Sequence, residues 1–225
     1  ITLKIGSTEI DKHTGVYLDA WNEVSDSTKK EWAMVGKYAN KSALKFKQTK
    51  KTKYTIPLQF FFNRHEGLGL PVSVIGNEKI KLEIKFNSLA NLVLFDGSNS
   101  IDASISMTSV NLKVDHIFLE GDEKNRLLQN SPFEFLIEII EMKENYSISN
   151  LSNLIFDNCV KEFIWVLRHT SRTGNSNPQI CLNKTATKGN DIFNYSGHAV
   201  TSDDTWDTFA NLQIKIGTTD LFDSS

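Results

Sequence analysis

A short segment near the start of the chain returns near its end, and this long-range repeat limits the fold more than any other feature. Residues 3–10, LKIGSTEI, match residues 214–221, IKIGTTDL, with identical or conservative residues at every position, at an offset of 211 residues. A chance match between common strand and turn residues is one explanation. The other is a duplicated β domain in which each copy has a glycine turn after the same strand. In that case the chain is a piece of a longer protein and spans one period of the duplication.

Short runs that alternate between apolar and polar residues give the second constraint. Residues 79–86, KIKLEIKF, alternate strictly, as in a strand with one buried face and one wet face. Proline is scarce at 4 residues and Phe is frequent at 14, a composition that favours strands. Other segments with strand character are residues 3–5, 54–62, 110–115 with 117–119, 133–140, 163–167 and 212–216. We therefore predict an all-β sandwich or barrel.

Helical signals are confined to two short segments. Thr28 and Glu31 have capping-box spacing, and Trp32 and Val35 follow on one face, which predicts a helix near residues 27–38. A second short helix is predicted at residues 122–129. Since these helices do not alternate with strands in βαβ order, no parallel sheet is expected.

Charge and composition exclude several classes of protein. Lys and Arg number 25 and Asp and Glu 27, and this balance argues against a protein that mainly coats nucleic acid. The apolar run at residues 133–140 is interrupted by glutamates and is far shorter than a membrane span. Cys159 and Cys181 are too few for a disulfide scaffold and are predicted to be buried or half-buried thiols.

Motifs for catalysis, metal binding and phosphate binding are absent from the sequence. There is no His-Glu-x-x-His, Cys-x-x-Cys, Gly-x-Ser-x-Gly or phosphate loop. The histidines are far apart in sequence and are interpreted as structural residues: His13, His65, His116, His169 and His198. We predict no catalytic residue, no metal ligand and no cofactor.

Two surface features have more than one interpretation. Residues 37–53 contain seven lysines and no acid, which suits an anionic lipid surface, a nucleic acid or an acidic partner, but equally a solvated edge protected from aggregation. Five Asn-x-Ser/Thr sequons are candidate N-glycosylation sites if the protein enters a secretory lumen: Asn40, Asn145, Asn150, Asn183 and Asn194.

The segment IPLQFFFNR at residues 56–64, followed by GLGLP at 67–71, resembles the major capsid proteins of nucleocytoplasmic large DNA viruses. That family has a proline-led aromatic strand, an Asn-containing turn, Gly-Leu-Ala-Leu-Pro and then an alternating strand. Other segments resemble the family in the same order: IGS at 5–7 with IDKH at 10–13, LKVDHIFLE at 112–120, FEFLIE at 133–138 and VKEFIWV at 160–166. Departures from the family pattern, at Ser7, Gly69, His116 and Ile192, leave loop lengths and subunit contacts open.

The resemblance implies an all-β double jelly roll, two tandem antiparallel eight-stranded sandwiches, here partial and with short helices in loops. Residues 1–120 would hold the later strands of the first jelly roll, 121–132 a connector, and 133–225 the early strands of the second. Both rolls would be incomplete, so their sheet edges would need partner strands from outside this chain.

The resemblance also implies a function without an active site. The protein would be a structural subunit of an icosahedral viral capsid, in which homotrimers form pseudo-hexagonal capsomers that tile the shell. Its partners would be neighbouring capsomers, minor capsid proteins and an internal membrane beneath the shell, with no specific nucleic acid. It would be found in the virion capsid and be assembled in the host cytoplasm. Capsomer contacts are expected from residues 25–53 and from loops 87–109, 143–158 and 170–190.

Two other classes share the all-β pattern. A jelly-roll lectin or receptor-binding surface protein could stack sugars on tryptophan, although the tryptophans also suit core or loop anchors: Trp21, Trp32, Trp165 and Trp206. An enzyme on a jelly-roll frame would need histidines that converge on a metal ion.

Overall fold

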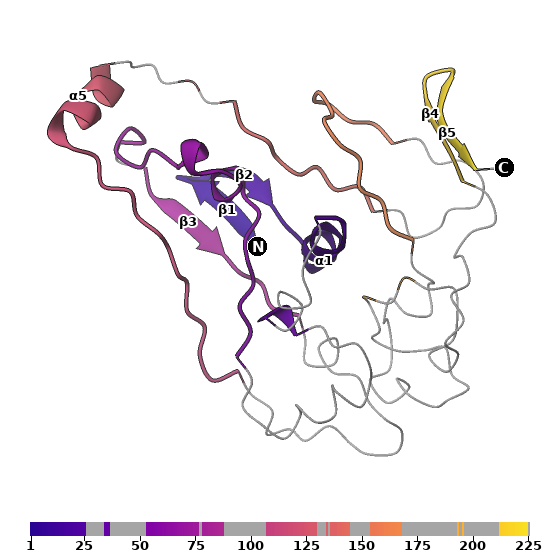
Figure 1. Ribbon diagram of the computed structural model, residues 1–225, viewed down its shortest axis with the longest axis horizontal. Helices are drawn as coiled ribbons and strands as arrows, with labels where there is room; N and C mark the ends of the chain where they lie inside the picture. Colours follow the sequence, from indigo (N-terminus) through magenta and orange to yellow (C-terminus); the bar gives the residue numbers. More distant parts are fainter. Residues whose placement is uncertain are drawn as a thin grey trace. The chain divides into compact units, whose positions relative to one another are not determined.

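The computed structural model describes residues 1–25, 34–36, 53–76, 78–87, 107–129, 134, 136–144, 154–167, 193, 195 and 212–224. Its elements (Figure 1) are β1 (Thr2–Ile5), β2 (Thr8–Lys12), α1 (Gly15–Val24), the 3₁₀ turns η1 (Phe61–Asn63) and η2 (Glu66–Leu68), β3 (Ile80–Glu83), α5 (Gly121–Gln129), β4 (Leu212–Ile216) and β5 (Thr219–Ser224). Short antiparallel strands and few helices fit the predicted all-β class. No helix in these ranges has the length and apolar character needed to cross a membrane.

The chain forms two compact units. Unit 1 comprises Ile1–Lys85, Asn111–Glu144 and Leu154–Asn158, and unit 2 comprises Phe86–Val110, Asn145–Asn153 and Cys159–Ser225. All the described elements except β4 and β5 belong to unit 1.

Unit 1 has a three-stranded antiparallel sheet in the order β2-β1-β3. The predicted strand at residues 3–5 is confirmed as β1, and the alternating segment 79–86 forms β3 over Ile80–Glu83. Ile80 and Leu82 are half-buried while the charged residues between and after them are exposed, as the alternation predicts. β3 is shorter than the alternating sequence because its pairing partner, β1, has four residues.

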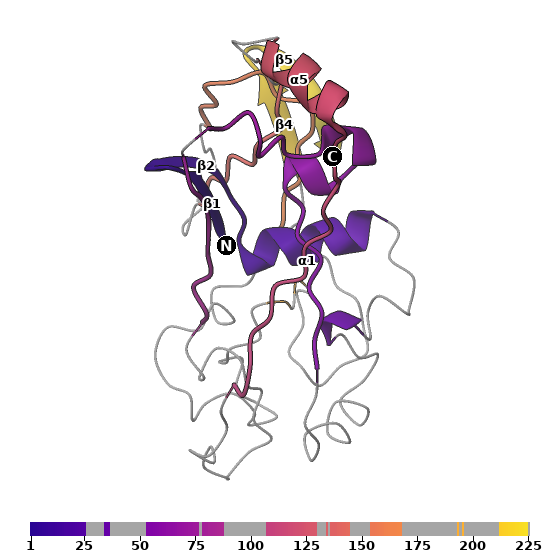
Figure 2. The same cartoon turned by 90° about the vertical axis from the view of Figure 1, so that its left-hand side faces the viewer.

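The chain passes from β2 directly into α1 (Figure 2). Thr14 is the N-cap of this helix, and its side-chain Oγ1 accepts a hydrogen bond from the backbone N–H of Tyr17 at 3.2 Å. Tyr17 and Ala20 are buried. The sequence analysis missed α1, although Tyr17, Trp21 and Val24 have helical spacing after a capping threonine. Of the helix predicted near residues 27–38, only 34–36 lie within the described residues.

Among the described residues of unit 1, the buried apolar side chains come from β1, α1, η1 and the residue before η1: Leu3, Tyr17, Ala20, Phe60 and Phe61. Phe60 is fully buried and stacks on the ring of Phe62 with centroids 5.8 Å apart. Burying a phenylalanine side chain contributes about 1.5–3 kcal/mol, so this aromatic group is a main anchor of the unit.

The strand predicted at residues 54–62 is wrong. The segment is irregular and ends in the η1 turn, where the N–H of Asn63 donates to the carbonyl oxygen of Phe60 at 2.8 Å. Pro57 has no backbone N–H that could donate in a strand ladder. The side-chain amide of Asn63 donates a hydrogen bond to the carbonyl oxygen of Leu58 at 2.8 Å. Phe60 and Phe61 are buried at this turn, whereas Tyr54 and Ile56 are exposed.

Three further predicted strands are absent where the structure describes them. Residues 110–119, 136–140 and 163–167 have no strand pairing. Val110, for example, is 53% exposed and Phe118 is 91% exposed. An isolated strand has no neighbouring strand to hydrogen-bond its backbone N–H and C=O groups. An alternating sequence alone is therefore not enough to form a strand.

The predicted helix at residues 122–129 is confirmed as α5, which begins one residue earlier. Asp122 and Glu123 lie in its first turn, where negative side chains interact favourably with the helix dipole. None of its residues is buried.

In unit 2, the predicted strand at residues 212–216 is confirmed as β4, which forms a hairpin with β5. This hairpin repeats the β1–β2 hairpin in its pairing register. Ile5 pairs with Thr8 and Ile216 with Thr219, and both hairpins have a β-bulge at the equivalent place, after Leu3 and after Ile214. Gly6 and Gly217 occupy the turns with φ of 62° and 61°. The sequence repeat is therefore also a structural repeat, down to its bulge.

Candidate functional site

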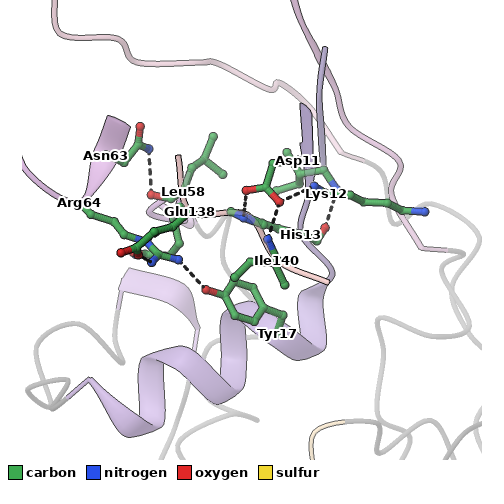
Figure 3. Close-up of polar contacts among 11 residues, drawn as sticks. Asp11, Lys12, His13, Tyr17, Leu58, Asn63, Arg64, Glu138 and Ile140 are labelled. Carbon is green, nitrogen blue, oxygen red and sulfur yellow. Dashed lines mark hydrogen bonds and ion pairs between the residues drawn. The ribbon is translucent and has the colours of Figure 1, made fainter. Parts of the chain in front are cut away.

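The most buried polar group in the described part of unit 1 is the pair Asp11 and His13 (Figure 3). Two residues apart in extended backbone, the side chains lie on one face of the strand end. The His13 Nε2–H donates to Asp11 Oδ2 at 2.9 Å, and the two side chains are 0% and 1% exposed. A carboxylate buried to this extent needs several donors to replace water.

The second carboxylate oxygen of Asp11 connects distant parts of the sequence. Oδ1 accepts from the backbone N–H of Lys12 at 2.8 Å and from that of Ile140 at 3.0 Å. The latter contact joins residues separated by 129 positions. Asp11 therefore fastens the β1–β2 hairpin to segment 136–144 without any strand pairing.

The His13 ring packs between aromatic side chains. It stacks on Phe60 with centroids 4.3 Å apart and an interplanar angle of 20°, and it lies tilted against Tyr17 at 5.1 Å. Its Nδ1 is buried and has no hydrogen-bond partner among the described residues. His13 thus serves as an aromatic core residue that also donates one hydrogen bond, which agrees with the structural interpretation of this histidine.

Arg64 is the second residue of the site that contacts several segments, and each nitrogen of its guanidinium group has a partner. Nη1 lies 2.7 Å from Glu138 Oε2, Nη2 donates to the hydroxyl of Tyr17 at 3.1 Å, and Nε donates to the carbonyl of Gln59 at 3.2 Å. The guanidinium also lies over the Trp21 ring, 5.0 Å from its centroid. One side chain therefore links α1, the segment before η1 and segment 136–144.

Segment 136–144 contacts the rest of unit 1 through three of its residues. Glu138 binds Arg64, the backbone N–H of Ile140 binds Asp11, and the sulfur of Met142 accepts a hydrogen bond from Thr14 Oγ1 at 3.2 Å. At the start of the segment, Leu136 is 95% exposed.

Two lysines of unit 1, the half-buried Lys4 and the exposed Lys143, have raised pKa values. The pKa of Lys4 is raised, chiefly by the hydrogen bond from its ammonium group to Glu83 at 2.8 Å. The pKa of Lys143 is raised by the same kind of bond to Glu141. Both ammonium groups therefore stay charged to higher pH than in an unfolded chain.

The five sequon asparagines, Asn40, Asn145, Asn150, Asn183 and Asn194, lie outside the described residues. Of the seven lysines in residues 37–53, only Lys53 is described, and it is exposed.

Of the remaining candidates, His65, His116 and Cys159 are described, whereas Cys181, His169 and His198 lie outside the described residues. His65 caps η2 by accepting the N–H of Gly67 at 2.9 Å, and His116 is exposed. Cys159 is an exposed free thiol, so the prediction of a buried or half-buried cysteine is wrong there. It follows an irregular segment whose neighbouring residues are also exposed. Within the described ranges, no group of three or more His, Cys, Asp or Glu residues could hold a metal ion.

The arrangement is suited to holding segments together and not to turning over a substrate. Its central acid and imidazole are buried, and each of the three nitrogens of its arginine side chain has a partner. Sequence reasoning had singled out residues 10–13 and 56–64 by resemblance but did not predict their contact with Glu138 or Ile140. The i, i+2 spacing of Asp11 and His13 was the available signal that both lie on one face.

Comparison with known proteins identifies the family of this chain. The family described as "Major capsid protein N-terminus" matches residues 1–120. The major capsid protein of Pyramimonas orientalis virus is 34% identical over 171 residues, covering 74% of this chain and 41% of the relative. Capsid protein 1 of Acanthamoeba polyphaga mimivirus is 31% identical over 183 residues, covering 74% of this chain and 31% of the relative. The major capsid protein of Paramecium bursaria Chlorella virus 1 is 29% identical over 144 residues, covering 63% of this chain and 31% of the relative.

The chain belongs to the family of viral major capsid proteins, because the family match covers more than half of its residues. Its relatives are major capsid proteins of large DNA viruses, so the resemblance found in the sequence is confirmed. The chain spans between 31% and 41% of the length of these three relatives. The search of solved structures found no significant match.

Proposed function

We propose that the chain is part of a structural subunit of an icosahedral viral capsid, without enzymatic activity. The observation that carries this proposal is the family match over residues 1–120, which contains the whole β1–β2 hairpin, α1, Arg64 and β3. The interlocked polar contacts of unit 1 support it, because they fix the conformation of segments and leave the central acid and imidazole inaccessible.

The fold that we propose for the whole protein is a double jelly roll. The repeated hairpins support it, since a tandem duplication leaves the same strand, turn and bulge twice in one chain. We propose residues 1–120 as later strands of the first roll, 121–132 as a connector that contains the whole of α5, and 133–225 as early strands of the second.

The assembly that we propose is a homotrimer that forms a pseudo-hexagonal capsomer. Two similar rolls in each of three chains present six similar flanks, which suits a hexagonal lattice. Capsomers would contact neighbouring capsomers and minor capsid proteins, with an internal membrane beneath the shell and no specific nucleic acid. The protein would be located in the virion capsid after assembly in the host cytoplasm.

Native mass spectrometry of the intact source protein tests this proposal, followed by dissociation to weigh one polypeptide. We expect a trimer whose polypeptide is about twice the length of this chain, in line with the 41% coverage of one relative. A stable monomer of 25.4 kDa would contradict both the trimer and the duplicated fold.

A further inference from the structure

The two copies of the hairpin differ at the end of their second strand. At the offset of 211 residues, Asp11 corresponds to Phe222 and His13 corresponds to Ser224. The pairing registers give the same correspondence, because the bulge directly precedes Asp11 in the first copy and Phe222 in the second. The pair of acid and imidazole is therefore present in the first copy and missing from the sequence of the second.

The hairpin does not need an acid at this place. The second copy forms the same register and bulge with Phe222 paired to Ile214. In the first copy, Asp11 is paired to Leu3, which is 1% exposed. A carboxylate beside a buried leucine costs free energy unless hydrogen-bond donors replace its water. The hairpin alone therefore does not account for Asp11, and its donors indicate what does.

One of the three donors to Asp11 comes from a distant segment. The other two come from the end of β2 and the residue that follows it. The distant donor is the backbone N–H of Ile140, 3.0 Å from Oδ1 and 129 positions away in the sequence. It lies in segment 136–144, which Arg64 and Thr14 also bind. This is the contact that the strands of the hairpin cannot supply.

Segment 136–144 belongs to unit 1, whereas the proposed division of the chain at residue 133 assigns it to the start of the second roll. The preceding helix α5 has no buried residue, so the packing of α5 does not hold the segment in place. Of the polar contacts that do, the one to Asp11 is better protected from water than the ion pair of Glu138. The Asp11 carboxylate is 1% exposed and the Glu138 side chain is 43% exposed. A hydrogen bond in such a buried place is strong and costly to break.

We propose that Asp11, oriented by His13, holds the start of the second roll on the first roll. The His13 Nε2–H binds Oδ2, which leaves Oδ1 to accept from Ile140. The side chain of Phe222 has no such acceptor, so the second copy cannot hold a segment in this way at the equivalent place. The inference rests on the proposed division into two rolls and extends it, since the rolls share a hairpin but are not interchangeable.

Ile140→Pro removes the donor and leaves Asp11 and His13 unchanged, and hydrogen-exchange mass spectrometry of the intact protein measures its effect. Peptides from segment 136–144 should exchange on the order of tenfold faster, because a hydrogen bond to a buried charged acceptor is lost. Leu136→Pro is the matched control, since it places a proline in the same segment at a residue that is 95% exposed. It should change this exchange by less than about twofold. Ile140→Ala keeps the N–H and should speed exchange less than Ile140→Pro does.

Asp11→Phe gives the first copy the residue of the second. It should speed exchange in segment 136–144 more than in β1 and β2, because the second hairpin forms with phenylalanine at this place. Equal acceleration in the hairpin and the segment would mean that Asp11 supports the hairpin itself, and this would overturn the proposal. Unchanged exchange with Ile140→Pro would overturn it too. A stable monomer in native mass spectrometry would overturn the division into two rolls and the proposal with it, whereas unchanged exchange in a protein that forms trimers would overturn this proposal alone.

Discussion

Among individual residues, a few polar side chains stabilise unit 1, because each forms hydrogen bonds with several segments of the chain. Asp11 accepts hydrogen bonds from His13, Lys12 and Ile140, and Arg64 is shared among α1, the segment before η1 and segment 136–144. When one such side chain is removed, its partners stay buried and lose their hydrogen bonds together. The loss is therefore larger than the net stabilisation of a single hydrogen bond.

We expect Asp11→Ala to lower the free energy of unfolding by about 3 kcal/mol, because it leaves three donors without an acceptor. Asp11→Asn should cost less, since its amide oxygen still accepts from the two backbone N–H groups. Urea unfolding measures both variants, with Lys124→Ala on the exposed helix α5 as a control that should stay within about 0.5 kcal/mol. Equal stability of Asp11→Ala and the unmodified protein would show that this buried cluster does not support the fold.

Arg64→Lys should lower the free energy of unfolding by about 1–2 kcal/mol, although the charge is retained. A lysine ammonium group cannot reach Glu138, Tyr17 and the Gln59 carbonyl together from one position. Glu138→Gln should cost less than about 1 kcal/mol, because the Glu138 side chain is 43% exposed and water screens the ion pair. Thermal unfolding of the two variants side by side checks the order, and a larger loss from Glu138→Gln would contradict it.

At the scale of elements, the repeated hairpin is defined by its turn and its bulge. In each copy a glycine at positive φ closes the turn, and an extra residue, Ile10 or Leu221, makes the bulge. A left-handed backbone conformation costs a residue with a Cβ about 1–2 kcal/mol, which explains a glycine at both places. The remaining turn residues, Ser7 and Thr218, vary conservatively.

Gly6→Ala and Gly217→Ala should each lower stability by about 1 kcal/mol, because alanine is strained at these φ values. Gly6→Ala should cost slightly more, since its Cβ would also meet the carboxylate of Glu78, which must move aside. Gly121→Ala is the control: nothing lies within 4 Å of its added Cβ, so no loss is expected. Hydrogen exchange of each hairpin gives the local readout, and a loss confined to Gly121→Ala would refute the assignment of strain.

For the whole molecule, membership of the major capsid protein family suggests which segments contact other subunits. A shell subunit must associate with copies of itself through many modest contacts, so its loops and flanks serve function while its core serves folding. On this proposal, segment 25–53 and loops 87–109, 143–158 and 170–190 belong to the contacts between chains.

Reversing the charge of Lys50, Lys51 and Lys53 together in the intact protein should reduce the yield of particles while the melting temperature stays unchanged. The reason is that acidic side chains would repel an acidic surface of a neighbouring subunit that the lysines attract. Electron microscopy counts the particles and calorimetry measures the melting temperature. Normal particle yields from this variant and from charge reversals in the three loops would rule out these segments as contacts.

Elements with local or repeated sequence signals could be predicted before the structure was known. Glycine turns and alternation located β1, β3 and β4, acidic first-turn residues accompany α5, and the match of two segments revealed the repeated hairpin. These signals depend on backbone preference and on the period of apolar side chains, and both are properties of residues that are close together in the sequence.

Long-range packing determines which alternating segments form strands and which side chains are in contact. Residues 110–115 alternate as β3 does, yet they form no strand ladder in the described part of the chain. Asp11 meets Ile140 across 129 positions, a contact that no local pattern encodes. Alternation indicates that a segment is able to pair as a strand. Pairing also needs a neighbouring strand with free backbone groups, and only the folded chain brings such a neighbour close.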